Sequence, residues 1–528
     1  MNFRYFSFVN LKEKSKKEKD ERFVNFPTFK GQYRTKLALD QTHGSCVVVE
    51  VQGGDGSVGC DAEERRALLR LRDVFKYPNG TTPLPSWDEE ETDCCMWERV
   101  KCDLSNRHVI QLSLARIRQL DLGISPFTLN YSSDNTILLN TSLFLPFREL
   151  RDLSLVDNSI RGFYGVLNLS KLQVLDLSEN GFHEIPSLGL LRSLRTLNME
   201  SNWIYTWPHF EELTNLKHLE LLNFVDTGLS GKIPQSLGSL TSLKFLSFSY
   251  NKYLNGSLTD GALTCNSAGI CKLRNLQELD LGWNSFEGRI PLCLGNLTSL
   301  RALILEQNFL TGTLPSTIFS TLNLLQYLSL SHNYFEGSFS FNSFGNNSKL
   351  EFFELENLNN TMIVNTENPP WMPQSQIKIF RLPNCKLNEP SGNLPSFLAI
   401  WEAKRTFDAT LELFEYGGGG ATLGDTTSLY ESRLQIAPSL SNDFDSSYEE
   451  RGSGICNKKR FELYKGNILN YMSGIDLSFN NFTGPIPHEI GLLSDIHTLE
   501  LITQSLHRLY PIYILQLKAD RMFGLVSQ

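Results

Sequence analysis

The sequence lacks any run of about 18 or more consecutive apolar residues, the length that a helix needs to cross a membrane. It also lacks the uninterrupted apolar stretch of roughly 7–15 residues that defines a secretory signal peptide. Ten charged residues crowd the eleven positions from Lys12 to Arg22, and the nearest apolar candidate, Cys46 to Val51, is short and lies late. We therefore expect neither a membrane helix nor an export signal in the chain as written.

Signatures of catalysis and of metal binding are also missing. No P-loop, protein-kinase signature set, G-x-S-x-G or H-E-x-x-H motif occurs. The nine histidines do not stand at metal-ligand spacing with cysteines. A formal charge of -9 over 528 residues leaves no basic footprint for nucleic acid. We expect a protein that is not an enzyme, holds no metal or cofactor and binds no nucleic acid.

What the chain does contain is a repeat. The stretch LQELDLGWN, from Leu276, shares one template with LQVLDLSEN from Leu172 and LQYLSLSHN from Leu325. This L-x-x-L-x-L-x-x-N pattern with a period of 20–29 residues is the signature of a leucine-rich repeat. Aligned on the template, the second apolar position falls at Leu153, Leu175, Leu197, Leu219, Leu246, Leu279, Leu303, Leu328, Phe353 and Phe380, and again at Ile475 and Leu499.

Each position of the template has a physical reason. The x-L-x-L-x core predicts a short strand whose leucines point inward and whose alternate residues face the concave side. One repeat cannot bury its own leucines, so neighbouring repeats must stack. The asparagine amide can pair with backbone groups that the stack would otherwise bury without partners. This predicts a structural ladder of Asn158, Asn180, Asn202, Asn251, Asn284, Asn308, Asn333 and Asn480, with Cys385 in the same slot.

The second half of each repeat and the segment before the repeats point to one family. GKIP, GRIP, GTLP and GPIP each follow a leucine or phenylalanine two residues before the glycine, and the sequence also contains LGSLTSL and LGNLTSL. Before the repeats, CDAEERRALLRLRDVF predicts a helix that Asp61 caps, with Glu64 completing a capping box. WDEEETDCCMWERVKC comes next, and FELYKGNILNYMSGIDLSFNNFTGPIP lies near the end. Together these motifs, over roughly residues 60–400 and 461–500, resemble the plant leucine-rich-repeat receptor-like proteins, the kinase-less class of cell-surface receptors.

The resemblance implies a right-handed α/β solenoid of the plant extracellular subtype with a disulfide-bonded N-terminal cap. It implies the pairs Cys60–Cys94 and Cys95–Cys102 in that cap, whereas the spacing alone leaves three pairings open. Arg99 departs from the family, which usually has glycine at this place in the W-x-G-V-x-C motif. We divide the chain into an N-terminal extension at 1–59 that we expect to be disordered, the cap at 60–110, repeats at 111–398, an irregular island at 399–470, resumed repeats at 471–502 and a divergent tail at 503–528.

The resemblance also implies the function, which is binding without chemistry. A non-catalytic ectodomain would recognise a peptide, protein or glycan signal in defence or development and would signal through a membrane-bound receptor kinase. Its location would be the extracellular face of the plasma membrane. Three alternatives stay open: a soluble enzyme inhibitor similar to the polygalacturonase-inhibiting proteins, a soluble decoy, and a non-functional truncated product. The YKGNIL segment at 464–469 argues against the inhibitor.

Concave-face positions are the candidate ligand-binding residues. Exposed aromatic side chains on a rigid curved surface are the usual anchors of an interface. Strand positions in the template include His218 and Glu220, and Ala302 and Ile304. The candidate contacts, all expected to be exposed, are Phe245, Tyr250, Glu278, Asp280, Trp283, Tyr327, His332 and Phe352.

Further modifications follow from the extracellular resemblance. A loop-closing disulfide is expected between Cys265 and Cys271, and Cys293 is expected to pack as a small apolar residue, while Cys456 has no evident partner. N-glycosylation sequons predict modification at Asn79, Asn130, Asn140, Asn168, Asn255, Asn296, Asn346, Asn359 and Asn481.

Overall fold

The structure is a computed structural model, and it describes residues 35–39, 46–50, 60–76, 82–88, 93–117, 136–258, 269–359, 361–365, 377–383, 385–387, 474–476, 498–500 and 522–524. The chain divides into two compact units, Met1–Val58 and Gly59–Gln528. In the first unit, strand β1 (Thr35–Leu39) pairs with the antiparallel strand β2 (Cys46–Glu50). The sequence did not predict this strand pair, which lies inside the segment that we expected to be disordered.

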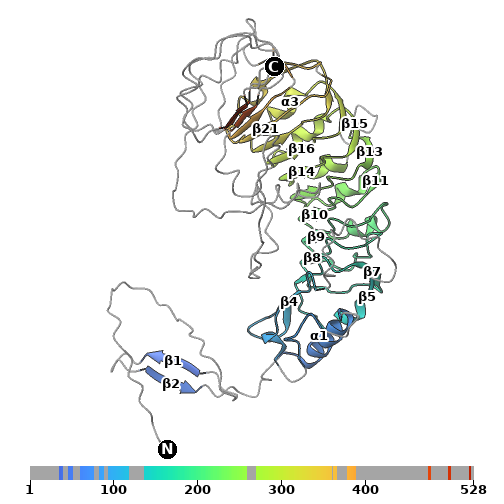
Figure 1. The fold of residues 1–528 in the computed structure, drawn as a ribbon, viewed down its shortest axis with the longest axis vertical. Helices are drawn as coiled ribbons and strands as arrows, with labels where there is room; N and C mark the ends of the chain where they lie inside the picture. The colour runs from blue at the N-terminus through green and yellow to red at the C-terminus, as the bar shows by residue number, and fades with distance from the viewer. Residues whose placement is uncertain are drawn as a thin grey trace, which may run out of the picture. The chain divides into compact units, whose positions relative to one another are not determined.

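The second unit is built around one long sheet of stacked three-residue strands (Figure 1). Strand β3 (Val100–Cys102) pairs antiparallel with β4 at the cap end, and every later pair is parallel. Consecutive repeats therefore add strands side by side, as the right-handed solenoid prediction requires. The strands in order along the sheet are β4 (Val109–Ser113), β6 (Asp152–Ser154), β8 (Val174–Asp176), β9 (Thr196–Asn198), β10 (Leu221–Asn223), β12 (Phe245–Ser247), β14 (Glu278–Asp280), β16 (Ala302–Ile304), β18 (Tyr327–Ser329), β21 (Phe352–Glu354), β23 (Ile379–Arg381), β25 (Gly474–Asp476), β26 (Thr498–Glu500) and β27 (Met522–Gly524).

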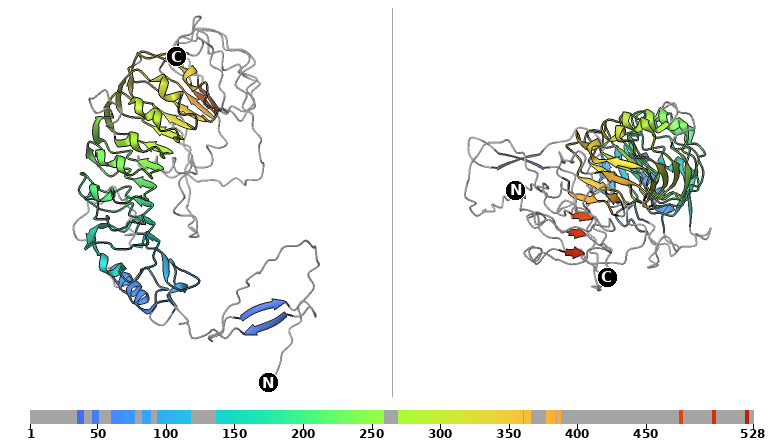
Figure 2. Two further views of the ribbon diagram at one scale, coloured as in Figure 1. Left: turned by 180° about the vertical axis from the view of Figure 1, so that it is seen from behind. Right: turned by 90° about the horizontal axis from the view of Figure 1, so that it is seen from above.

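Shorter sheets and single helical turns complete each coil. The stacked repeats curve into an arc, and the long sheet lines its inner side (Figure 2). The short sheets lie on a different side of each coil. The short sheets contain β5 (Ile137–Asn140) with β7 (Ile160–Tyr164); β11 (Ser230–Gly231), β13 (Tyr253–Ser257), β15 (Ser285–Gly288), β17 (Phe309–Gly312) and β19 (Tyr334–Phe335); and β20 (Ser338–Ser340), β22 (Ile363–Asn365) and β24 (Lys386–Leu387). Helical turns lie at α2 (Phe210–Leu213), α3 (Ser316–Phe319), η3 (Thr141–Phe144), η4 (Gln235–Ser239), η5 (Gly269–Lys272), η6 (Leu292–Asn296) and η7 (Phe341–Phe344).

The space between the sheets is filled by one continuous apolar core. The inward leucines of the template, such as Leu153, Leu279 and Leu328, are at most 1% exposed. Toward the C-terminal repeats phenylalanine replaces leucine, and Phe341 packs edge-on against Phe353 with ring centroids 4.9 Å apart. Stacking buries side chains that a single repeat would leave in water, so the repeats stabilise one another.

Helix α1 (Ala62–Val74) and two disulfides form the N-terminal cap. Asp61 caps the helix, and its carboxylate accepts from the backbone N–H groups of Glu63 at 2.8 Å and Glu64 at 3.1 Å. Cys60 is bonded to Cys94, and Cys95 to Cys102, as the family resemblance implied; Cys94 lies in the turn η1 (Cys94–Met96). The cap therefore closes the first face of the core, which would otherwise meet water.

The expected capping box is wrong in its second half. The Glu64 side chain turns away from Asp61 and is fully buried. Its Oε2 accepts from the backbone N–H of Val109 at 3.0 Å, and its Oε1 lies 3.3 Å from Nδ1 of His108. The Glu64 carboxylate therefore accepts a hydrogen bond from the start of strand β4 rather than from the first turn of helix α1.

Arg99, the departure from the family motif, stands at a position that needs a left-handed backbone. Its φ is 65°, which glycine adopts without strain and other residues adopt at a cost of about 1 kcal/mol. Its guanidinium donates to the backbone carbonyl of Ala115 at 2.7 Å. This charged hydrogen bond offsets the strain and explains how arginine is tolerated there.

The predicted ladder is present, and every ladder asparagine in the described residues is at most 6% exposed. Asn284 shows the pattern: its Nδ2 donates to the carbonyls of Phe248, Leu281 and Gly282, each at 2.9 Å. Its Oδ1 accepts from the backbone N–H of Asn251, 3.1 Å away. Cys385 takes the same slot, 2% exposed, with its Sγ 3.7 Å from the carbonyl of Leu355; Asn480 lies outside the described residues.

One repeat was placed in the wrong register. Leu222, not Leu219, pairs with Leu197 and Leu246 at the inward position, so the strand's outer positions are Leu221 and Asn223 instead of His218 and Glu220. Thr227 then occupies the asparagine slot, fully buried, and its Oγ1 donates to the Phe224 carbonyl at 3.0 Å. The sequence LKHLELLNF fits the leucine template in two frames, and the absence of an asparagine left nothing to choose between them.

The expected cysteine roles in the middle repeats are also wrong. Cys271 is bonded to Cys293, so Cys293 is not a free apolar residue and Cys271 is not paired with Cys265, which lies outside the described residues. The bond joins η5 to η6 across neighbouring repeats. The spacing along the chain favoured a bond between Cys271 and the nearby Cys265. Stacking instead brings together residues of neighbouring repeats, such as Cys271 and Cys293, which are 22 residues apart.

We predict that Asn284→Ala strongly destabilises the protein. The substitution leaves the buried N–H of Asn251 without a partner, at about 1–3 kcal/mol, and it removes one of the hydrogen bonds to each of the three carbonyls. Chemical denaturation of the two proteins would show a lower midpoint for the variant. Asn275→Ala is the matched control, because Asn275 is exposed and donates to one carbonyl, that of Thr241. Equal midpoint shifts for the two variants would contradict a structural ladder.

Candidate functional site

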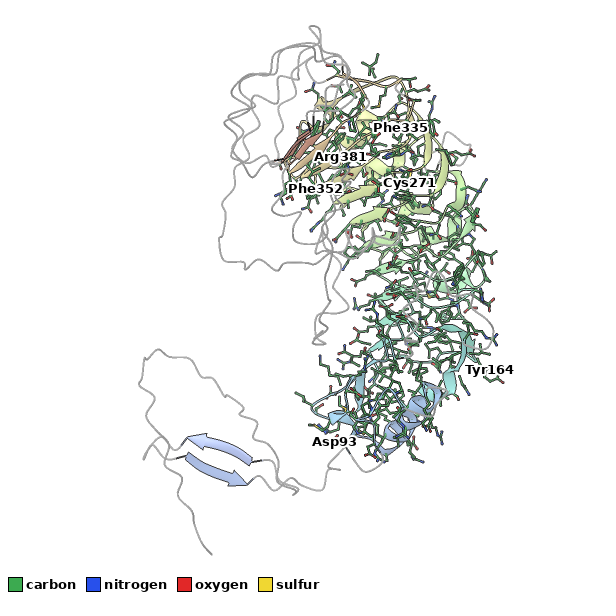
Figure 3. The ribbon with its side chains drawn as sticks, in the orientation of Figure 1. Asp93, Tyr164, Cys271, Phe335, Phe352 and Arg381 are labelled. Atoms are coloured by element: carbon green, nitrogen blue, oxygen red, sulfur yellow. A yellow bond between two sulfur atoms is a disulfide. The ribbon has the colours of Figure 1, made fainter. Side chains whose placement is uncertain are left out.

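The inner face of the long sheet arranges its side chains in straight columns. Because the parallel strands are in register, Phe245, Glu278, Ala302, Tyr327 and Phe352 follow one another across β12, β14, β16, β18 and β21. A second column runs through Ser247, Asp280, Ile304, Ser329 and Glu354. Figure 3 shows Phe352 and Arg381 on this inner side, toward the end of the arc away from the cap. The strands therefore do bring the predicted strand residues together on one surface.

These strand residues are buried, which corrects the expectation that they are exposed. Phe245, Glu278, Asp280, Tyr327 and Phe352 are between 4% and 8% exposed. Apolar residues at matching positions pack against one another: Tyr327 lies on Phe352 with ring centroids 5.6 Å apart, next to Ala302 and Ile304. An alternating pattern predicts the direction of a side chain but not how far its neighbours cover it.

Buried carboxyl groups on this face are held by short polar contacts. Asp280 accepts from the Ser247 hydroxyl and from the Gly282 backbone N–H, each at 3.0 Å. Burial raises the pKa of Asp280 above its usual value, and these hydrogen bonds oppose the rise. The second column of the inner face therefore contains buried polar groups, and these groups expose little charge to solvent.

Tyr250, Trp283 and His332 occupy the same turn position of their repeats at the edge of the sheet, with Gln307 in that position between Trp283 and His332. Each stands directly before a ladder asparagine in a left-handed turn, with φ of 59°, 55° and 56°. Each is partly buried, and the rings of Tyr250 and Trp283 are stacked, with centroids 5.0 Å apart and planes 9° apart. The left-handed turn that directs the asparagine into the core also sets the direction in which these three side chains leave the backbone.

Glu306 joins Trp283 to the strands, a role that the sequence did not predict. Its Oε1 accepts from Nε1 of Trp283 at 3.2 Å, and its Oε2 accepts from the Ser329 hydroxyl at 2.5 Å. Burial raises the pKa of Glu306, and the nearby negative charge of Glu354 raises it further. Glu306 lies two residues beyond the end of strand β16 and one residue before the left-handed turn at Gln307, a position that the template leaves free.

A second carboxylate, that of Glu356, lies beside His332 at the same edge of the sheet. Nε2 of His332 lies 3.5 Å from Oε2 of Glu356, which is the counterpart of Glu306 two repeats later. Along the edge of the inner face, the stacked rings of Tyr250 and Trp283 are therefore followed by Glu306, His332 and Glu356. We call Tyr250, Trp283, Glu306, His332 and Glu356 the edge strip.

The described glycosylation sequons lie away from the inner sheet. Asn79, Asn130 and Asn481 fall outside the described residues. The other six predicted asparagines are exposed: Asn140, Asn168, Asn255, Asn296, Asn346 and Asn359. None of these six belongs to a strand of the long sheet.

Within the described residues no cluster of three or more histidine, cysteine, aspartate or glutamate side chains could hold a metal ion. No helix among those residues is long and apolar enough to span a membrane. Among the described cysteines Cys385 is a free thiol, and burial raises its pKa to about 12, so it stays protonated near neutral pH.

Comparison with protein families supports the architecture. Residues 140–388 match the family model described as leucine-rich repeat region, residues 61–103 match leucine rich repeat N-terminal domain, and residues 473–493 match leucine rich repeat. The family models therefore cover the cap, the main stack and the resumed repeat separately.

Curated relatives are plant proteins. The chain is 28% identical to Receptor-like protein 1 of Arabidopsis thaliana over 83% of this chain and 50% of that protein. It is 30% identical to Receptor-like protein 14 of the same plant over 84% of this chain and 47% of that protein. The chain thus spans about half the length of these relatives.

Among solved structures, the ectodomain of the Arabidopsis thaliana membrane receptor kinase GASSHO1/SCHENGEN3 in complex with CASPARIAN STRIP INTEGRITY FACTOR 2 is similar. It is 24% identical, with a TM-score of 0.48, over 83% of this chain and 52% of that one.

We predict that stability depends on pH through Asp226, which stands in the same turn position as Tyr250 one repeat earlier. Burial raises the pKa of Asp226 to about 6. Well below pH 4 the carboxyl is protonated in both folded and unfolded chains and contributes nothing. Between about pH 4 and 6 the unfolded chain ionises first, so the free energy of unfolding falls as pH rises, and above pH 6 the loss is complete.

Asp226→Asn removes this loss and keeps a residue that tolerates the left-handed turn. The unfolding free energy of the variant should exceed that of the wild type by up to about 3 kcal/mol at pH 7.5, and the two should approach each other as the pH falls to about 3. Because the cause is burial rather than a charged partner, added salt should leave the difference in place. An equal gain at both pH values would contradict the assignment.

Proposed function

The chain belongs to the plant leucine-rich-repeat receptor-like proteins, and on this premise we propose that it is a non-catalytic ligand-binding ectodomain whose edge strip and inner face contact the ligand. The family resemblance supports a peptide, protein or glycan ligand, a place on the extracellular face of the plasma membrane, and a membrane-bound kinase as the signalling partner. The observation that carries the proposal is the stacked pair Tyr250 and Trp283 linked through Glu306 to the strands.

Rigidity is the first argument for this surface. Tyr250, Trp283 and His332 stand in the turn that delivers a ladder asparagine to the core, and Glu306 is held by Trp283 and Ser329, so less conformational freedom is left to lose on binding. Tyrosine and tryptophan held in this way present large area with few rotatable bonds, and such residues dominate binding energy at interfaces.

Electrostatics give the second argument. Glu306 keeps a raised pKa because burial and Glu354 disfavour its charge. A ligand group that donates a hydrogen bond or carries a positive charge would stabilise the carboxylate here more than water does at an exposed glutamate. Lysine, arginine and amide donors of a peptide or protein meet this requirement, and sugar hydroxyls meet it in part.

The absence of sequons from the inner strands agrees with this use of the surface. The six described sequon asparagines are exposed on the other sides of the coils. A glycan is bulky, so an N-linked chain on the inner strands would obstruct a ligand there. Glycosylation at the predicted positions would leave the inner face open.

We predict that Trp283→Ala weakens ligand binding by roughly 30-fold, the effect of losing an interface anchor worth about 2 kcal/mol. The measurement is surface plasmon resonance with the immobilised protein against defined panels of secreted plant peptides, microbial surface proteins and cell-wall oligosaccharides. Trp283→Phe keeps a ring for stacking on Tyr250 and should lose less. Melting temperatures of both variants separate lost binding from lost folding.

Phe309→Ala is the matched control. Phe309 is an aromatic residue 50% exposed on β17, a strand of a short sheet rather than of the inner face. Equal loss with Phe309→Ala, or no loss with Trp283→Ala for every ligand that binds, would reject the edge strip as the site. Inhibition of a polygalacturonase by the protein would favour the inhibitor alternative instead.

A further inference from the structure

The described sequon asparagines fall into two structural groups. In three cases the residue two positions earlier is a large apolar side chain left in water: Leu138 before Asn140, Val166 before Asn168 and Tyr253 before Asn255, with 47%, 48% and 55% exposure. In the other three the residue two positions earlier is at most 2% exposed: Leu294 before Asn296, Phe344 before Asn346 and Asn357 before Asn359. The exposed apolar side chains of the first group have no evident role in the core.

Strand β13 gives the clearest case of the first group. Its five residues, Tyr253 to Ser257, alternate exposed and buried, so Tyr253, Asn255 and Ser257 project from the same face. Residues two apart in a strand lie about 7 Å apart on that face. The sequon Asn255-Gly256-Ser257 therefore sets an acceptor amide beside an exposed phenol ring.

We propose that the N-glycan on Asn255 folds back on the chain, with its first sugar packed on the ring of Tyr253. The proposal rests on the extracellular location in the proposed function, because N-glycosylation requires export. It adds a role for the glycan that ligand binding does not need: the sugar covers an aromatic surface that the fold leaves in water.

The chemistry of the two partners fits. A pyranose ring presents a face of C–H groups, and an aromatic ring presents a negative face to them. Lys252 places its Nζ 4.9 Å from the centroid of the Tyr253 ring, so a charged group already lies over one face of this ring. A lysine on the surface can leave that position at little cost, since exposed cation–π contacts contribute only about 0.5–1 kcal/mol.

A second sequon repeats the arrangement on different strands. Asn140 in β5 is the register partner of Tyr164 in β7, and Tyr164 is 67% exposed. Parallel partners at matching positions project to the same side, so the amide of Asn140 has an exposed tyrosine beside it as well as Leu138. Tyr164 points outward from the ribbon in Figure 3.

The test measures how well each glycan is protected on the folded protein. The full chain is exported from plant or insect cells behind an added leader, with mannosidases inhibited so that every glycan is of the high-mannose type. An endoglycosidase that cuts between the first two sugars is then applied to the native protein. Mass spectrometry of peptides at successive times gives a release rate for each sequon.

We predict that Tyr253→Ala speeds release at Asn255 by about two- to tenfold, the factor expected from losing one aromatic stacking contact. Tyr253→Phe keeps the ring and should keep the slow rate. Asn296, with its buried neighbour Leu294, is the internal control and should be released at the same rate in all three proteins.

Stability provides a second readout that does not depend on the enzyme. Ser257→Ala abolishes the sequon. Tyr253→Ala should lower the melting temperature of the glycosylated chain and should have no such effect in the Ser257→Ala background. A double-mutant cycle of this kind isolates the contact between ring and glycan.

The outcomes separate this inference from the proposed function. Equal release at Asn255 with and without the Tyr253 ring, or no glycan at Asn255 while Asn296 carries one, rejects the inference and leaves ligand binding untouched. If the chain purified from its own tissue carries no glycan at any sequon, the extracellular location fails, and the inference fails with it.

Discussion

Stacking short coils buries backbone groups at every turn, and pairing those groups is the constraint on which this structure depends. The ladder asparagine meets it because one amide both donates and accepts, so it connects its own turn to the preceding coil. Thr227 and Cys385 show the limits of substitution, since each still reaches one carbonyl. Asn357 stands one residue early in its repeat, yet its Oδ1 accepts from the Phe335 N–H at 2.9 Å. The fold therefore requires a polar group in that space, and this group need not come from one fixed position of the repeat.

The same turn connects the fold to the surface. To bring the asparagine inward, the preceding residue takes a left-handed conformation, and tyrosine, tryptophan and histidine accept it at Tyr250, Trp283 and His332. Each such residue costs on the order of 1 kcal/mol relative to glycine. In exchange, the side chain is held in one direction at the edge of the inner face. A constraint of the core thus produces ordered side chains on the surface.

The repeat and most strand positions could be predicted because each leaves a periodic signal in the sequence, whereas the pairing of the cap cysteines was implied by the family resemblance and not by their spacing. Register failed at Leu222, where two leucine frames compete and threonine hides the ladder slot. The Cys271–Cys293 bond was missed because its partners are close only after stacking. The predicted exposure of Tyr327 and Phe352 was wrong, because the column of matching side chains that buries them forms only once the strands are in register. Glu306 was missed because the template assigns its position no role, and only the packed structure places Trp283 and Ser329 against it.

Side chains on the two kinds of sheet are left in different environments, and this division follows from the geometry of the coil. The three-residue strands of the long sheet stack at matching positions, so large residues there cover one another, as Tyr327 and Phe352 do. The shorter sheets are interrupted between repeats, and residues such as Tyr253 and Tyr164 keep more than half of their surface in water. A ligand that meets the inner face finds a packed, polar-edged surface already in place. The rings of Tyr253 and Tyr164 are instead left exposed, and the sequons beside them offer a sugar that would cover them within the same chain.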